Sequence, residues 1–282
     1  MQRRKPTFKD ILAGEEIVID QTITTYGKWF IKFGQGVEVL MGLSYLDLKP
    51  PIAENVDFRS IVLHDYYQAS FSFRACSLLM EHGFYSDAFI CLRSLMERLV
   101  KNRYFFGNKD IVLVYEKYQL RDKMNKDEKD QLREELAQDE KKNKVKNLKI
   151  KDMFNFLAEE GAYGKMYKFL CPFVHKNVGY SSVQLNQDLN NSRSLLPEFN
   201  KKSAEGLINI MLYLLYGYLN LAPSFFEYEW KEGDEQLLTT YEESKAFFKA
   251  QIIKKRRDFP LFHDWDKYMR SIIEIDAESW GD

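Results

Sequence analysis

The stretch Ser86–Gly107, S-D-A-F-I-C-L-R-S-L-M-E-R-L-V-K-N-R-Y-F-F-G, has the clearest structural pattern in the chain. Ser86 is a favourable N-cap residue and Gly107 is favourable just beyond a helix end, so both ends of one helix are indicated. Apolar residues recur on one side at helical spacing: Ala88, Leu92, Leu95, Met96, Leu99 and Phe106. The stretch therefore predicts a core helix against which other helices pack.

A second line of residues runs along the same predicted helix. Arg93, Glu97, Val100 and Tyr104 follow one another at spacings of four, three and four residues, which places them on one side of a helix. One interpretation is an ion pair between Arg93 and Glu97 at the boundary of the core. The other is that both side chains face a functional feature of a neighbouring helix.

The rest of the chain repeats the helical pattern and shows no series of strands, so the expected fold class is all-α, a multi-helix antiparallel bundle. Two long amphipathic segments, 15–44 and 58–82, precede the central stretch. Their apolar residues recur at spacings of four and three: Ile19, Ile23, Tyr26, Phe30, Phe33, Val37 and Leu40 in the first, and Val62, Tyr66, Ala69, Phe73, Cys76 and Met80 in the second. Gly83 predicts a very short loop between the second segment and 86–106. The other expected helices are 110–120, 150–160, 162–177, 203–222, 235–256 and 264–276. We expect one structural domain with an N-terminal part (1–57), a core bundle (58–222) and a C-terminal helical extension (223–282).

Two segments depart from the ordinary amphipathic pattern. Residues 121–149 are dense in charges of both signs, with only Leu132, Leu136 and Val145 able to pack, and predict a solvated helix or hairpin that projects from the body. Residues 206–226 contain no charge and approach the length of a membrane span. Because Asn209, Asn220 and Pro223 interrupt this run, we expect the central helix of a bundle and no membrane partner.

Composition limits the function classes. The 282 residues include 41 Lys and Arg against 42 Asp and Glu, so the broad basic field of a high-affinity duplex-binding protein is absent. The three cysteines show no paired pattern, and no apolar segment follows the charged N-terminus, so we expect a cytoplasmic protein.

Few segments carry a chemical motif. The sequence contains no Gly-rich phosphate loop and no HExxH element. Cys171 and His175 could supply two zinc ligands, but no second pair of ligands is visible. We therefore expect neither a metal nor a cofactor. Packing is the simpler interpretation of that pair, although a Cys–His nucleophile is chemically open.

Two separated segments together resemble a known family. R-S-L-M-E at Arg93–Glu97 is followed by Y-K-F-L-C-P-F-V-H at Tyr167–His175. This order, over roughly 58–221, resembles an uncharacterised bacterial all-helical family that is similar in general shape to HEPN (higher eukaryotes and prokaryotes nucleotide-binding) domains. HEPN ribonucleases carry R-x(4–6)-H on one helix, whereas Arg93 and His175 belong to different predicted helices. Arg59 and His64 match that spacing formally and, with Tyr104, are secondary candidates; Arg256 or Arg257 with His263 is interrupted by Pro260.

The resemblance implies a function as well as a fold. It implies a HEPN-like protein of a bacterial phage-defence or toxin–antitoxin system, acting as a dimer and without a metal, in which Arg93, Glu97 and His175 meet and bind or cleave RNA. A histidine moves protons near neutral pH and an arginine holds a phosphate, so the residue types fit that chemistry. The alternative is a non-catalytic interaction module that binds a protein partner or antitoxin, which the near-neutral charge favours. A capped histidine at a helix end remains the simpler interpretation of His175.

Overall fold

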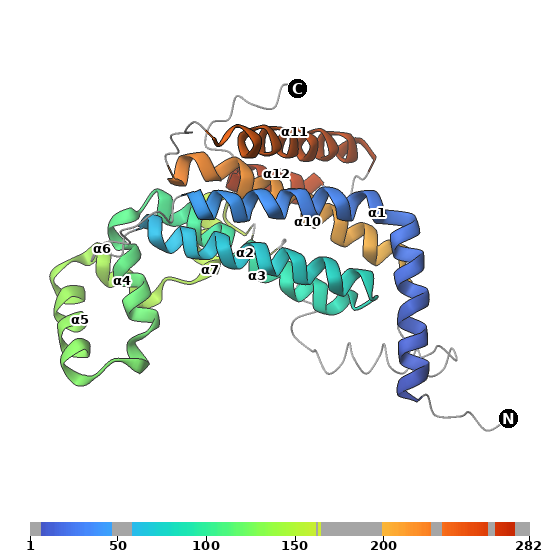
Figure 1. Ribbon diagram of the computed structural model, residues 1–282. Coiled ribbons are helices and arrows are strands. Elements are labelled where there is room, and N and C mark those ends of the chain that lie inside the picture. The colour runs from blue at the N-terminus through green and yellow to red at the C-terminus, as the bar shows by residue number, and fades with distance from the viewer. Residues whose placement is uncertain are drawn as a thin grey trace.

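The computed structural model describes residues 7–46, 58–161, 163–164, 199–226, 233–258 and 263–273. All the regular secondary structure in this part of the chain is helical, which confirms the all-α expectation (Figure 1). The main helices are α1 (Phe8–Leu46), α2 (Phe58–Glu81), α3 (Tyr85–Phe106), α4 (Lys109–Gln119), α5 (Lys126–Gln138), α7 (Ile150–Leu157), α10 (Lys201–Phe226), α11 (Glu235–Asp258) and α12 (His263–Ile273). Short helical turns join α4 to α7: η1 (Arg121–Lys123), α6 (Glu140–Asn143) and η2 (Lys144–Asn147).

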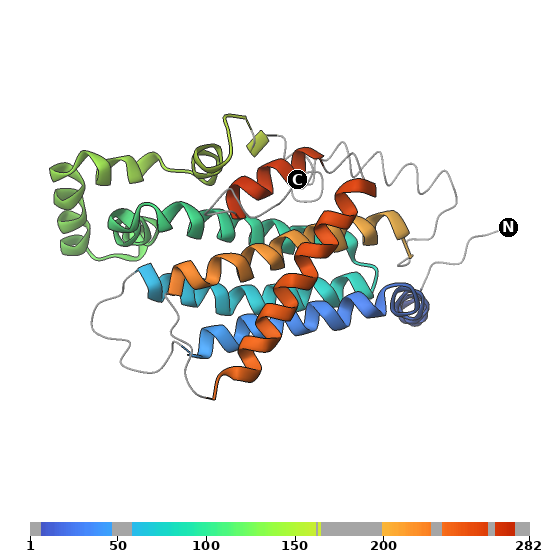
Figure 2. The ribbon, with the colours of Figure 1, turned by 90° about the horizontal axis from the view of Figure 1, so that it is seen from above.

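α10 lies at the centre of the bundle. It packs against α1, α2, α3, α11 and α12, and α11 crosses it obliquely when the molecule is seen from above (Figure 2). All its residues from Leu207 to Leu219 are buried. By length and composition α10 could cross a membrane, but 83% of its most apolar window is buried inside the fold. It therefore packs as the expected central helix.

The α2–α3 hairpin follows the sequence pattern closely. Six residues of α2 at spacings of four and three are fully buried: Val62, Tyr66, Ala69, Phe73, Cys76 and Met80. Gly83 has a φ of 79°. The Phe84 N–H donates to the Leu79 carbonyl (2.8 Å) and the Gly83 N–H to the Met80 carbonyl (3.2 Å), which closes the helix as a Schellman motif. The expected helix end and short loop are confirmed.

The ends of α3 differ from the prediction, whereas most of its core face agrees with it. Ala88, Leu92, Leu95, Met96 and Leu99 are fully buried as expected, and Phe106 is only partly buried. Phe84 occupies the N-cap position without a side-chain cap, so the assignment of Ser86 as N-cap was wrong. The helix starts earlier because Tyr85 packs into the core at 8% exposed. Gly107 does end the helix, but with right-handed backbone (φ −83°).

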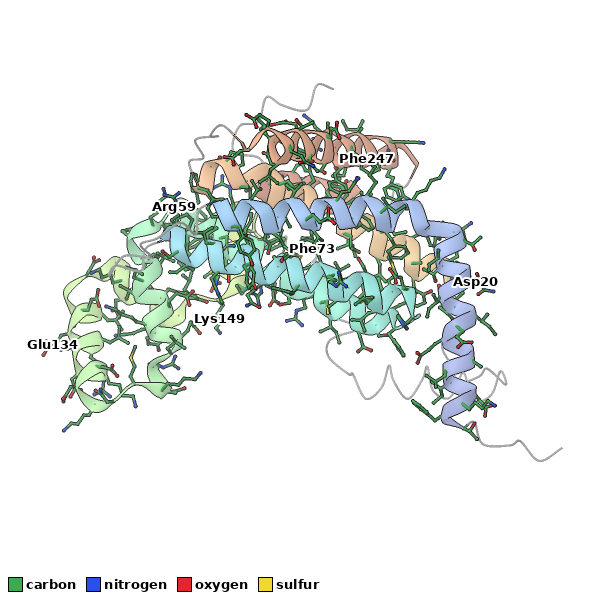
Figure 3. All side chains as sticks on the ribbon, in the orientation of Figure 1. Asp20, Arg59, Phe73, Glu134, Lys149 and Phe247 are labelled. Carbon is green, nitrogen blue, oxygen red and sulfur yellow. The ribbon has the colours of Figure 1, made fainter. Side chains whose placement is uncertain are left out.

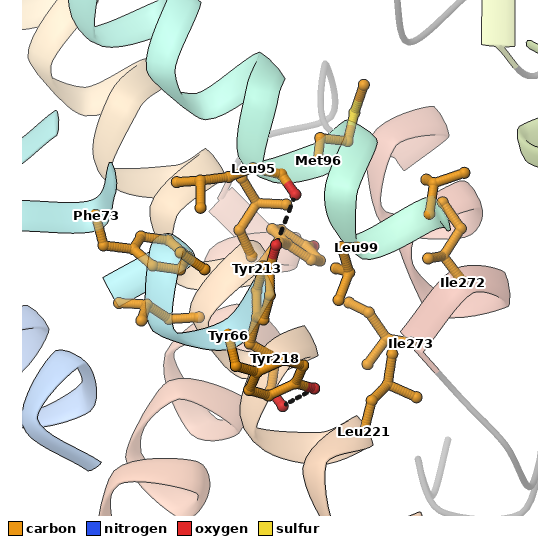
Figure 4. Close-up of a cluster of buried hydrophobic side chains, with 14 of the residues drawn as sticks. Tyr66, Phe73, Leu95, Met96, Leu99, Tyr213, Tyr218, Leu221, Ile272 and Ile273 are labelled. Atoms are coloured by element: carbon orange, nitrogen blue, oxygen red, sulfur yellow. Dashed lines mark hydrogen bonds between the residues drawn. The ribbon is translucent and has the colours of Figure 1, made fainter. Parts of the chain in front are cut away.

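Tyrosine hydroxyls fix the register of three helices at the centre (Figure 4). The Tyr66 hydroxyl of α2 donates to the Tyr218 carbonyl of α10 (2.8 Å), and the Tyr218 hydroxyl donates to the Leu95 carbonyl of α3 (3.0 Å). Burial raises the pKa of Tyr218 well above its ordinary value, so its hydroxyl stays protonated as a donor. These neutral bonds satisfy the buried hydroxyls and hold α2, α3 and α10 in one relative position.

α1 follows its predicted pattern only in part. Tyr26, Phe33 and Leu40 are buried, but Ile23 is 51% exposed. The expectation of a packed face was wrong at Ile23, because the N-terminal portion of α1 runs away from the bundle (Figure 1).

Residues 121–149, the charged projection, extend from the bundle on α4 (Figures 1 and 2). Leu132, Leu136 and Val145 are buried, as the sequence indicated. Asn125 and Glu128 form a reciprocal capping box at the start of α5. A small apolar cluster and a capped helix therefore support this segment.

Candidate functional site

Arg93 and Glu97 form a close ion pair on one flank of α3. The Arg93 Nε donates to Glu97 Oε1 at 2.8 Å. Their side chains are 15% and 27% exposed, respectively. The pair lies at the edge of the core, where a carboxylate fixes the orientation of a guanidinium and water still reaches part of it.

Tyr104 continues the same flank of α3 and lies against α7. Its ring meets that of Phe156 edge-on, with centroids 5.4 Å apart. Phe156 is itself 71% exposed. The predicted line from Arg93 to Tyr104 therefore ends beside an exposed aromatic side chain of another helix.

His175 lies outside the described residues, as do Tyr167, Cys171 and Pro172. A meeting of Arg93, Glu97 and His175 stays a prediction.

Arg59 and His64 are exposed on the N-terminal half of α2. Five positions on a helix correspond to about 140°, so the two side chains leave α2 in different directions. The ring of Phe58, next to Arg59, contacts that of Phe106 (6.3 Å between centroids), at the opposite end of α3 from Arg93. The fold therefore separates Arg59 from Arg93 by about 20 Å along the helix axis.

The third formal match, Arg256 or Arg257 with His263, spans two separate helices. α11 ends at Asp258 and α12 begins at His263. The expected break of the helix between these residues is confirmed, and their side chains lie outside the described part of the structure.

A charged cluster that sequence reasoning missed joins α2, α3 and α4. Asp65 is only 6% exposed. Lys101 Nζ lies 3.0 Å from Asp65 Oδ2 and 3.3 Å from Glu116 Oε1, and Arg98 Nη1 lies 3.7 Å from Asp65 Oδ1. Burial alone would lower the pKa of Lys101, but the two carboxylates outweigh it and raise this pKa. Alternating charges of this kind hold the three helices together.

The described side chains include neither a cluster that could bind a metal nor a disulfide. No group of three or more His, Cys, Asp or Glu residues in that part of the chain could hold a metal ion. Cys76 and Cys91 are free thiols there. Burial raises the pKa of the Cys76 thiol well above its ordinary value, which makes a thiolate nucleophile unfavourable at this position.

The charged residues of the projection form two groups, one of ion pairs around Glu135 and one rich in lysine. Glu135 of α5 accepts from Lys142 (3.1 Å) and from Lys117 of α4 (3.4 Å), and Arg133 pairs with Asp130 (2.8 Å). The segment that follows, 144–151, holds four exposed lysines and no acidic residue. The interpretation as a solvated surface of mixed charge therefore fits the ion-paired residues around Glu135 and not the segment 144–151. The sequence contains a signal for this difference, because residues 141–151 include no Asp or Glu.

Comparison with known proteins adds one similarity. Residues 59–192 match a family described as a family of unknown function (DUF5677). The match covers a little less than half of the 282 residues, from α2 through α7 and beyond, and includes Arg93, Glu97, Tyr104 and the lysine-rich segment. No curated protein and no solved structure matches the chain.

Proposed function

We propose that this chain is a HEPN-like protein of a bacterial phage-defence or toxin–antitoxin system that binds RNA and cleaves it without a metal. The observation that supports the proposal most directly is the Arg93–Glu97 pair, in which a carboxylate 2.8 Å away orients a guanidinium at the edge of the core. An oriented guanidinium matches the geometry of a phosphate and stabilises charge that develops on it.

The proposed reaction assigns a separate role to each residue. His175 takes the proton of a ribose 2′-hydroxyl, and the 2′-oxygen attacks the adjacent phosphorus. The bond from phosphorus to the 5′-oxygen breaks, and that oxygen takes up a proton, which leaves a 2′,3′-cyclic phosphate and a 5′-hydroxyl. Arg93 holds the phosphate as negative charge develops, and Glu97 positions Arg93.

Cleavage of a labelled single-stranded RNA in EDTA tests this proposal. We expect His175→Ala and Arg93→Ala each to lower the cleavage rate by at least about 100-fold, because general acid–base catalysis by His175 and charge stabilisation by Arg93 are each expected to contribute at least that much. Arg93→Lys should restore little, since an ammonium lacks the planar fork. Arg133→Ala is the matched control, because it removes another paired arginine, 75% exposed, from the projection. A fully active His175→Ala protein that is folded would exclude the catalytic role.

An exposed aromatic group favours a second candidate function, binding of a protein partner. Tyr45 of α1 is 59% exposed and its ring lies edge-on to Tyr67 of α2, which contacts Phe71 (46% exposed). Exposed aromatic side chains of this kind are enriched at protein interfaces. A chain that neither binds nor cleaves RNA, but whose homodimer or antitoxin complex is lost in Phe71→Ser, would support this candidate instead.

A further inference from the structure

The end of the charged projection and the first turn of α7 carry four lysines, here called the lysine strip: Lys144, Lys146, Lys149 and Lys151. All four are exposed. Buried Val145 and half-buried Leu148 and Ile150 alternate with them and pack on the core. The lysines are therefore exposed on a backbone that the apolar residues anchor to the core.

Three of the four lysines in the strip carry a positive charge that no described carboxylate pairs with. Within the described chain, Lys146, Lys149 and Lys151 form no ion pair, whereas Lys117 and Lys142 both pair with Glu135. The nearest acid along the chain, Asp152, accepts a hydrogen bond from the backbone N–H of Lys149 (3.0 Å). This segment thus differs from the mixed-sign surface before it.

An aromatic platform lies next to the strip. Phe156 lies in the last turn of α7, seven residues and about 10 Å along the axis from Lys149, the N-cap residue of that helix. Figure 3 shows Lys149 where the projection meets the bundle. Phe156 is 71% exposed and its ring is steadied edge-on by Tyr104 (5.4 Å). Exposed rings beside a basic track are the elements that bind single-stranded nucleic acid, through base stacking and phosphate contacts.

We propose that the lysine strip and Phe156 form a binding surface for single-stranded RNA. This proposal rests on the proposed function and specifies single-stranded RNA as the substrate. The phosphates lie along the lysines and one base stacks on Phe156. The strand then passes Tyr104 toward Arg93, eleven residues and about 16 Å along α3. A paired duplex buries its base faces, so the aromatic contact selects single strands over duplexes.

Fluorescence anisotropy with the full chain and a fluorescein-labelled 12-nucleotide oligouridylate tests this binding surface. We expect Lys146→Gln/Lys149→Gln/Lys151→Gln to weaken binding at least 10-fold at low salt. The slope of log Kd against log salt should fall by about 2, since each phosphate contact on a single strand contributes about 0.7. The matched control is Lys28→Gln/Lys202→Gln/Lys254→Gln, which removes the same charge from exposed positions on α1, α10 and α11 and should change Kd less than 3-fold.

Phe156 gives an independent measurement. Phe156→Leu should weaken binding about 10-fold with an unchanged salt slope, and Phe156→Tyr should bind as the wild type does, because only the aromatic face stacks. Equal loss in both triple variants, or tighter binding of oligoglutamate or duplex RNA than of oligouridylate, would overturn the assignment of this binding surface. If the wild-type chain bound no RNA at all, the proposed function itself would fail, which is a different outcome from RNA binding that ignores the strip.

Discussion

Lys101 of α3 lies 3.0 Å from the carboxylate of Asp65 on α2 and 3.3 Å from that of Glu116 on α4. One ammonium group thereby bridges three helices, with 18% of its side chain exposed. The charged projection begins directly after α4. Lys101 therefore links α2 and α3 of the hydrophobic bundle to α4, the helix from which the charged projection extends.

Replacing Lys101 should cost stability. Lys101→Met leaves Asp65, 6% exposed, with only the longer contact to Arg98, so we expect the free energy of unfolding to fall by about 2–3 kcal/mol. Urea unfolding measures this change. The control is Lys117→Met, whose side chain is 55% exposed and which should cost about 0.5 kcal/mol or less. Equal effects of the two substitutions would show that the buried bridge adds nothing.

Gly217 of α10 should not tolerate a methyl group. A Cβ there would lie 2.9 Å from Leu99 Cδ2 and 3.0 Å from Ile273 Cγ1, so Gly217→Ala should destabilise the protein by about 1–3 kcal/mol despite its better helix propensity. Gly34→Ala on α1 is the matched control. Nothing lies within 4 Å of a Cβ at Gly34, and this substitution should stabilise by about 0.5–1 kcal/mol. Thermal denaturation of both variants should show melting temperatures that shift in opposite directions.

Removing the hydroxyl of Tyr218 should leave the Leu95 carbonyl without its 3.0 Å donor. We expect Tyr218→Phe to lower the free energy of unfolding by about 1–2 kcal/mol, because the ring stays in place while a buried acceptor loses its bond. Tyr45→Phe, at a side chain 59% exposed, should be close to neutral. Chemical denaturation of the two variants provides the comparison, and a neutral Tyr218→Phe would contradict the role of this bond.

Glu135 should make the free energy of unfolding depend on pH in the acidic range. Burial alone would raise the pKa of Glu135, but Lys142 and Lys117 outweigh it and lower this pKa below the ordinary value of 4.5. A lowered pKa in the folded state adds stability above the ordinary value, and this contribution is lost as the pH falls through the folded-state pKa. The wild type should therefore exceed Glu135→Gln in unfolding free energy at pH 7, and the difference should shrink below pH 4.5. A difference that grows on acidification would reverse the sign of this argument.

Helical periodicity was sufficient to predict the core face of α2. All six predicted residues of α2 are fully buried, since a spacing of four and three places them on one stripe. Periodicity also placed Arg93 and Glu97 in contact, because both belong to one helix.

Contacts between helices were not predictable in the same way. The bridge from Asp65 to Lys101 depends on the register of α2 against α3, and the contact of Tyr104 with Phe156 depends on where α7 returns to the bundle. A single sequence does not encode such distances as a local pattern. The start of α3 was misplaced for a related reason, since packing of Tyr85 outweighed the capping preference of Ser86.

The hydroxyl–carbonyl bonds from Tyr66 to Tyr218 and from Tyr218 to Leu95 involve no charged group, whereas the contacts of Glu135 with Lys117 and Lys142 in the projection are ion pairs. Added electrolyte screens the second kind of contact and leaves the first almost unchanged. Rising ionic strength should therefore speed amide hydrogen exchange in α5 well before it affects α10. The charged projection would then loosen as the salt concentration rises, while the packing of α2, α3 and α10 stays the same.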